Sequence, residues 1–171
     1  MRVRAATPAD AEPIADLHVR AWRSAYRGQI ADAYLDGLTV EGLLPNLRWS
    51  LERAPEHWRM WVAEDEGAIV GFASTGPSQD ADSTPKVAEL FALYVEPERV
   101  GTDLGSALLD HAVDDLRGRG FRAATLWVLE TNADARAFYE RAGWTTDGAT
   151  TTEALGEESL PTVRYRTALA S

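Results

Sequence analysis

Residues 95–109 read VEPERVGTDLGSALL, and this stretch determines how the rest of the chain is organised. An apolar run ends at Val95, and a helical stripe of apolar residues begins at Leu104. Gly101 and Gly105 have no Cβ atom, so a ligand can approach the backbone closely at these positions. The first turn of a helix also carries unpaired N–H groups and a partial positive charge. The stretch predicts a strand, a tight loop and a helix start that suits a phosphate group, or else an ordinary tight turn.

Two apolar stretches flank this loop and its helix. Residues 87–95 (VAELFALYV) and 122–129 (RAATLWVL) are nearly continuous apolar runs, which are typical of strands buried on both faces. The helical stripe between them covers residues 105–116 and stops before Gly118. A strand, a helix and a second strand in this order predict a βαβ crossover with a parallel strand pair.

The remaining elements follow from hydrophobic periodicity on either side of the crossover. We predict strands at residues 2–6, 57–62, 68–74, 144–152 and 162–169, and helices at residues 7–26 and 133–142. Residues 31–53 predict a further helical stretch that is broken by Gly and Pro. The element order predicts an α/β protein with a layered sheet of mixed direction. The length of 171 residues predicts a single domain, residues 1–171.

The composition excludes several classes of protein. The sequence has no cysteine and three histidines without a metal-binding spacing, so we expect neither disulfides nor a metal. The net charge of -10 disfavours nucleic-acid binding, although it would attract a cationic small molecule. Neither a signal peptide nor an apolar run long enough to span a membrane occurs. We therefore expect a cytoplasmic protein with no nucleic-acid or membrane partner.

A second distinctive stretch, residues 132–144, reads NADARAFYERAGW. Asn132 lies at or just before the start of the predicted helix, and Tyr139 lies two turns into it, on the side toward the sheet edge. In isolation, Asn132 would be a helix cap and Tyr139 a core aromatic.

Together and in this order, the two stretches resemble the GNAT superfamily of acetyl-CoA-dependent N-acetyltransferases. The family patterns are V-x-P-x-x-[QR]-G-x-G-[IVL]-G-x-x-L-L and N-x-x-A-x-x-F-Y-x-x-x-G-[FW]; residues 132–144 match the second throughout. The resemblance implies a mixed, mostly antiparallel sheet with a central splayed parallel pair and helices on both faces. It also implies an acyltransferase that uses acetyl-CoA as co-substrate and acts on an amine of an acceptor.

The resemblance further implies where the coenzyme binds. The pyrophosphate would lie on the loop between the strand that ends at Val95 and the helix that begins at Leu104. The pantetheine arm would pair with the splayed strand as an additional strand does. The implied coenzyme contacts are the backbone of Leu93, Tyr94 and Val95, the loop and helix start Val100, Gly101, Thr102, Asp103, Leu104, Gly105 and Ser106, and the side chains of Asn132 and Tyr139.

Two positions depart from the family pattern: Val100 replaces Gln or Arg, and Asp103 replaces Gly. A carboxylate facing the diphosphate at ~4 Å would be repelled by about 4 kcal/mol at an effective dielectric near 20. We therefore expect Asp103 to turn outward and cap the helix by accepting an N–H from Gly105 or Ser106.

Acetyl transfer needs a proton donor for the departing thiolate and a base for the amine. Tyr139 is the predicted general acid, because the family places this phenol near the thioester sulfur. Glu89, an acid inside an apolar run, is either a base with a raised pKa or a strand-end residue that reaches water. The resemblance favours the base, and His18 is its competitor.

The acceptor side is the least specific part of the sequence. Trp22 and Tyr26 are the candidate acceptor contacts, together with a predicted polar loop at residues 147–159 whose acids would suit a cationic amine. A catalytically silent acyl-CoA-binding regulatory domain is the alternative function, and a dinucleotide-binding fold is disfavoured because GxGxxG is missing. The sequence leaves open a monomer or a homodimer.

Overall fold

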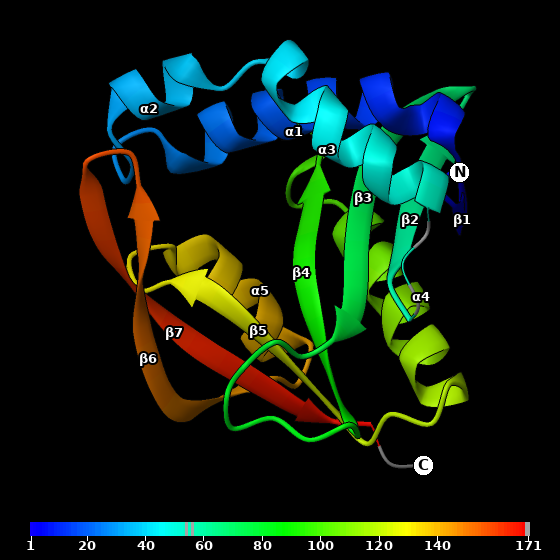
Figure 1. The fold of residues 1–171 in the computed structure, drawn as a ribbon, viewed down its shortest axis with the longest axis vertical. Helices are drawn as coiled ribbons and strands as arrows, with labels where there is room; N and C mark the ends of the chain where they lie inside the picture. The colour runs from blue at the N-terminus through cyan, green and yellow to red at the C-terminus, as the bar shows by residue number, and fades with distance from the viewer. Residues whose placement is uncertain (54, 56, 170–171) are drawn as a thin grey trace.

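The computed structural model describes residues 1–53, 55 and 57–169. These residues form a seven-stranded sheet covered by helices (Figure 1). The strands are β1 (Arg2–Ala5), β2 (Arg59–Asp65), β3 (Ala68–Pro77), β4 (Val87–Val95), β5 (Ala123–Leu129), β6 (Thr145–Leu155) and β7 (Glu158–Ala168). Their order across the sheet is β1-β2-β3-β4-β5-β7-β6. Neighbouring strands are antiparallel except β4 and β5, which are parallel.

The parallel pair separates soon after it begins. β4 and β5 pair from Val87↔Ala123 to Glu89↔Thr125, after which β4 stays with β3 and β5 stays with β7. A β-bulge places Phe91 opposite no residue of β3, and a bulge bends the strand that carries it. The two strands consequently diverge into a V, which is visible in Figure 1. This confirms the splayed parallel pair.

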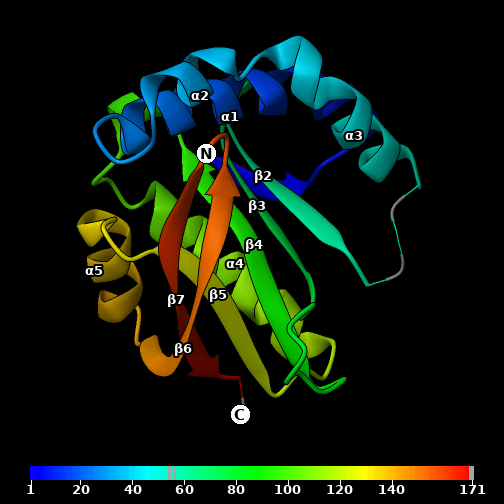
Figure 2. The same cartoon turned by 60° about the vertical axis from the view of Figure 1, so that its left-hand side comes forward.

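Helices cover both faces of the sheet, as predicted. They are α1 (Ala11–Tyr26), α2 (Asp32–Gly37), α3 (Val40–Arg53), α4 (Leu104–Gly118) and α5 (Ala133–Arg141), with short 3-10 turns η1 (Pro8–Asp10) and η2 (Pro97–Arg99). In Figure 2, α1, α2 and α3 form one layer, while α4 lies behind the strands.

Apolar stripes attach these helices to the sheet. In α1, Ile14 and Leu17 are fully buried and pack with Phe72 of β3 on one face. In α4, Leu104, Leu108, Leu109, Ala112 and Leu116 recur at helical spacing and are buried on the other face. The sheet therefore has two apolar layers, and the splay opens between them.

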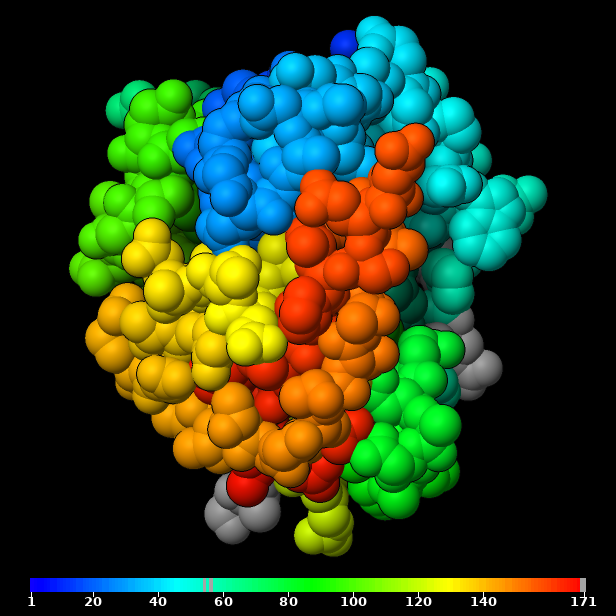
Figure 3. Space-filling view, turned by 90° about the vertical axis from the view of Figure 1, so that its left-hand side faces the viewer, coloured from blue at the N-terminus to red at the C-terminus, as the bar shows by residue number. Residues whose placement is uncertain are grey.

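The β6–β7 hairpin differs from the sequence prediction. The predicted polar loop at residues 147–159 is wrong, because most of it is β6 and the turn that leads into β7. The hairpin tip reaches the helical layer, where the N–H of Ala31 donates to Glu158 Oε1 (3.1 Å) and Gly156 lies against Tyr34. Figure 3 shows the tip lying against α2. Pairing with β7 turns a polar sequence into a strand whose side chains face solvent.

The helical stretch predicted at residues 31–53 divides into α2 and α3. The break falls at Leu38 and Thr39, whereas Pro45 lies inside α3. Pro45 is the sixth residue of this helix, so its missing N–H leaves only the carbonyl of Glu41, on an exposed residue, without its helical partner. Of the described helices, none is long and apolar enough to cross a membrane.

Candidate active site

The loop before α4 presents free backbone donors, as residues 95–109 predicted. Gly101 has φ +84°, a conformation that glycine adopts without strain, and this reverses the chain before the helix. The N–H groups of Gly101, Asp103, Gly105 and Ser106 have no hydrogen-bond partner among the described residues. Four free donors at a helix N-terminus are suited to the oxygens of a phosphate group.

Asp103 does not cap α4, so that prediction is wrong. Asp103 occupies the N-cap position with φ -73° and ψ 0°, and its side chain accepts no capping hydrogen bond. An N-cap side chain normally reaches N2 or N3 from an extended backbone conformation, and Asp103 is instead helical. Thr102 takes over part of this role, because its Oγ1 accepts the N–H of Leu104 (3.4 Å). The Asp103 carboxylate is exposed beside the free donors.

The edge of β4 that faces the splay forms the second part of the site. Leu93, Tyr94 and Val95 pair with Ala73, Phe72 and Gly71 of β3, on the side away from β5. On the β5 side, these residues have no strand partner within the described chain. An extended ligand could therefore pair with this edge as an added strand does.

Asn132 and Tyr139 of α5 lie at the open end of the V. Asn132 caps α5 by accepting the N–H of Ala135 (3.3 Å), as predicted. The Tyr139 ring lies between Phe138 and Trp144, and its hydroxyl has no hydrogen-bond partner among the described residues. Burial raises the pKa of the Tyr139 phenol above its ordinary value, so it keeps its proton at neutral pH.

Two further phenols lie nearby. The hydroxyls of Tyr26 in α1 and Tyr94 in β4 are 3.1 Å apart, and burial raises the pKa of both. Burial is the main cause of the raised pKa of Tyr139, and the nearby Tyr26 phenol adds to it because two ionised phenols would repel each other. The sequence had indicated only the backbone of Tyr94; its side chain could have been found from the alternation along β4, which places it on the α1 face.

An aromatic cluster extends from these phenols along α1. His18 stacks on Trp22 (5.3 Å between centroids) and lies near Phe72 and Tyr94. Burial lowers the pKa of His18 to about 4. The Nε1 of Trp22 is buried without a hydrogen-bond partner among the described residues. His18 is therefore a neutral member of an aromatic cluster, and a weak base.

Glu89 lies where β4 and β5 separate, at the last pair of their register. Its Oε1 accepts the N–H of Gln79 (3.3 Å) and the hydroxyl of Ser78 (3.5 Å), both from the connection between β3 and β4. Burial raises its pKa, and the N–H of Gln79 acts in the opposite direction. The structure thus places Glu89 as a half-buried carboxyl group at the apex of the V.

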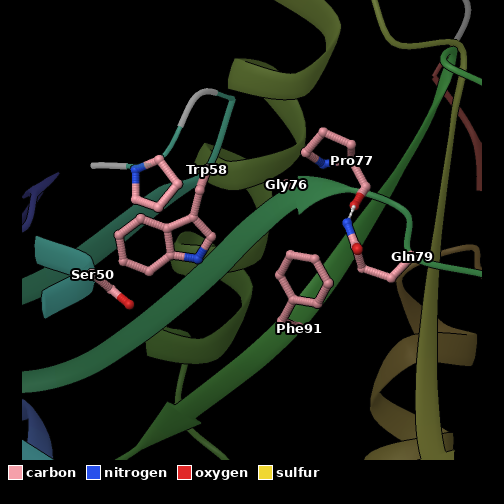
Figure 4. Close-up of a pocket in the computed structure, with 7 residues that line it drawn as sticks. Ser50, Trp58, Gly76, Pro77, Gln79 and Phe91 are labelled. Carbon is pink, nitrogen blue, oxygen red and sulfur yellow. Dashed lines mark hydrogen bonds between the residues drawn. The ribbon is translucent and has the colours of Figure 1, made fainter. Parts of the chain in front are cut away.

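A hollow lies on the α3 side of the sheet and is lined in part by Gln79, whose N–H donates to Glu89. Its volume is about 260 Å³, and Trp58 and Phe91 lie on opposite sides of it (Figure 4). The Nε1 of Trp58 donates to Ser74 Oγ (2.9 Å), and Gln79 lines the hollow with its side chain. The sequence did not indicate Trp58 or Phe91, because the β-bulge that exposes Phe91 depends on strand pairing.

The structure brings most of the predicted site residues to one opening. The loop donors, the β4 edge, Asn132 and Tyr139 surround the V, with Glu89 at its apex and Trp22 and Tyr26 in the adjoining helix. Val100 is 67% exposed at the rim of the loop. Among the described residues, no group of three or more His, Asp or Glu side chains could hold a metal ion.

Comparisons with known proteins identify the family of the chain. The sequence model of the acetyltransferase (GNAT) family matches residues 12–144. A Mycobacterium tuberculosis protein described as a probable N-acetyltransferase is 34% identical, over 97% of this chain and 92% of that protein. The chain therefore belongs to the GNAT family of acetyltransferases.

Solved structures share the fold. The PaiA N-acetyltransferase from Thermoplasma acidophilum, in complex with coenzyme A, has a TM-score of 0.75 at 20% identity and covers 95% of this chain and 96% of its own. The yncA protein from Salmonella typhimurium, with its cofactor acetyl-CoA, has a TM-score of 0.76 at 21% identity and covers 100% and 95%. The predicted fold class is thus confirmed.

We predict that His18 makes the protein less stable in mild acid. The unfolded chain takes up a proton near pH 6.5 and the folded chain only near pH 4, so protonation favours unfolding in that interval. Urea unfolding should show the free energy of unfolding falling as pH drops from 6.5 toward 4. The His18→Phe variant keeps an aromatic ring and should lose most of this slope. An NMR titration midpoint near 6.5 for His18 would contradict the prediction.

Proposed function

We propose that the protein transfers an acetyl group from acetyl-CoA to a primary amine of an acceptor, by direct attack in a ternary complex. The observation that carries the proposal is that hydrogen-bonding groups without a partner among the described residues follow one another along the V. Free N–H donors at the start of α4 are followed by an unpartnered β4 edge and then by the free hydroxyl of Tyr139. Membership of the GNAT family supports the acetyl donor.

The donors before α4 are proposed to hold the pyrophosphate. Gly101, Asp103, Gly105 and Ser106 would bind its oxygens through their N–H groups, while Val100, Thr102 and Leu104 shape the loop. The backbone of Leu93, Tyr94 and Val95 would pair with the amide groups of the pantetheine arm, and Asn132 would contact the same arm. These residues fit an elongated ligand with phosphates at one end and amides along its length.

The proton transfers are assigned to Glu89 and Tyr139. Glu89, in its charged form, takes a proton from the acceptor ammonium, directly or through a water molecule. The neutral nitrogen then forms a bond to the acetyl carbonyl carbon as the carbon–sulfur bond breaks. Tyr139 donates its hydroxyl proton to the thiolate, while the nitrogen now bonded to the acetyl group loses its second proton to solvent. Tyr139 then regains a proton from solvent, and Glu89 releases its proton there. The raised pKa of Tyr139 keeps the proton on the hydroxyl at neutral pH, so the phenol can hydrogen-bond the sulfur as negative charge develops on it.

The acceptor is proposed to approach from the side of α1. Trp22 and Tyr26 would contact it there, and the net charge of -10 would favour a cationic amine. A cytoplasmic location and a monomeric or homodimeric state remain predictions from the sequence.

Calorimetry with coenzyme A, followed by a panel of amines with acetyl-CoA, tests the proposed function. We expect binding of coenzyme A and amine-dependent release of free thiol. Binding without release from any amine would indicate a silent acyl-CoA-binding domain. Absence of binding would contradict the proposal.

We predict that Tyr139→Phe lowers kcat by about 10²-fold or more, because the thiolate loses its proton donor. The KM for acetyl-CoA should change little, since the ring and its packing remain. Steady-state kinetics of the purified variant measure both. The matched control is Tyr34→Phe, which removes a phenol hydroxyl of α2 where this helix lies against Gly156 of the hairpin tip. An unchanged kcat for Tyr139→Phe would remove this residue from the mechanism.

We predict that Glu89→Gln abolishes the acid limb of the pH–rate profile. Glu89 must be charged to act as a base, and burial raises its pKa, so the wild-type rate should fall at a pH above the ordinary carboxyl range of about 4.5. The variant should be slow and lack this limb. The control is Glu12→Gln, an exposed acid in the first turn of α1. A profile that the Glu89 substitution leaves unaltered would reject the assignment.

We predict that Asp103→Asn tightens coenzyme A binding by about fivefold at low salt. An exposed charge ~4 Å from a phosphate costs about 1 kcal/mol in water. Titration calorimetry should show the gain shrinking as salt is added, because exposed charges are screened. The control is Asp110→Asn, an exposed acid further along α4. Weaker binding by Asp103→Asn would mean that the carboxylate supports the loop.

A further inference from the structure

Arg164 of β7 is a buried residue at the centre of a cluster of three aspartates near the apex of the V. Its side chain is 10% exposed and contacts the three aspartates. The Nε donates to Asp147 Oδ2 (2.7 Å), the Nη1 to Asp80 Oδ2 (3.1 Å), and Nη1 and Nη2 together to the two oxygens of Asp82 (2.8 Å each). The guanidinium also lies over the ring of Trp127 in β5, 5.5 Å from its centroid. One side chain thus joins three segments of the chain.

Asp80 is held at both of its oxygens. The Nε1 of Trp127 donates to Asp80 Oδ1 (3.0 Å), while Arg164 binds Oδ2. Charge-assisted, geometrically matched hydrogen bonds of this kind fix a carboxylate more firmly than a single exposed contact does. The connection between β3 and β4 is therefore anchored to β5 and β7 through Asp80.

The anchored connection is the one that meets Glu89. The N–H of Asp80 donates to Ser78 Oγ (3.2 Å), and Ser78 Oγ and the N–H of Gln79 both donate to Glu89 Oε1. Ser78 and Gln79, the two residues before Asp80, thus donate the side-chain hydrogen bonds that Glu89 accepts among the described residues. Movement of Asp80 would displace both donors together.

We infer that Arg164 and Trp127 are positioning residues for Glu89. They fix Asp80, and through it the Ser78 and Gln79 donors that orient the Glu89 carboxylate. The inference rests on the proposed role of Glu89 as general base. A base must be held within about 0.5 Å of its productive position by residues that are themselves locked in place, and this cluster supplies that lock.

The Trp127→Phe variant tests the inference because it removes one hydrogen bond and keeps the ring under Arg164. We expect kcat to fall about 3- to 30-fold with an unchanged KM for acetyl-CoA, since the coenzyme contacts are elsewhere. In a Glu89→Gln background, the same substitution should have almost no further effect on kcat. Arg164→Lys, which loses the planar fork, should behave in the same way and more strongly.

The matched control is Arg4→Lys. Arg4 donates to both oxygens of Asp10 (2.8 and 2.9 Å) and to Glu64 at the far edge of the sheet, so it is a comparable ion cluster without a path to Glu89. Urea unfolding is measured for all variants, so that a loss of stability is separated from a loss of kcat. A lower unfolding midpoint with kcat retained is the expected result for Arg4→Lys.

A second readout requires no acceptor. The carboxyl carbon of Glu89, assigned by its loss in Glu89→Gln, should shift or broaden in the ¹³C NMR spectrum of Trp127→Phe and remain unchanged in Arg4→Lys. An unchanged resonance in Trp127→Phe would overturn the inference.

The kinetic outcomes separate this inference from the proposed function. If Glu89→Gln is impaired and the effect of Trp127→Phe simply adds to it, the cluster acts independently of Glu89 and the inference fails while the base assignment stands. If Glu89→Gln turns over normally, the base assignment fails and takes the inference with it. If Arg4→Lys loses as much kcat as Trp127→Phe does, the loss in both variants reflects general destabilisation, and the inference is overturned.

Discussion

The separation of β4 from β5 after Glu89 leaves backbone groups along both strands without a sheet partner. Such groups are costly when buried, because each N–H or C=O that leaves water needs a hydrogen bond in exchange. The opening persists because each strand is held on its other side, β4 by β3 and β5 by β7. The β-bulge at Phe91 directs β4 away from its parallel neighbour. Everything proposed for the site depends on this gap.

The gap also explains why polar groups cluster in an otherwise apolar interior. The two hydrophobic layers beneath α1 and α4 meet the opening from opposite sides, and Tyr26, Tyr94 and Tyr139 bring hydroxyls to it. Burial raises the pKa of all three phenols, so they remain neutral donors. A neutral hydroxyl costs less to bury than a charge and still offers a proton. The interior thereby remains stable beside a site that requires polarity.

Local sequence signals predicted the local features and missed those that depend on distant partners. The loop at Gly101, the cap at Asn132 and the helical stripe of α4 each depend on residues close together in the sequence. The splay itself came only from the family resemblance, because strand pairing is not encoded in one stretch. Asp103 was misassigned because the prediction assumed an extended backbone at the cap. The contacts of Arg164 join residues more than eighty positions apart, as with Asp80 and Asp82. No periodicity could show them.

The position of β7 has a consequence for how the molecule assembles. From β2 to β4, each strand pairs with the strand that precedes it in the chain. β7, in contrast, lies between β5 and β6 in the sheet. β5 shares only the short register from Val87 to Glu89 with β4, so its main support comes from β7, which follows both β5 and β6 in the chain. Contacts between segments far apart in the chain form slowly, because loop closure must precede them. During translation, half of the cleft would therefore wait for β7 to leave the ribosome.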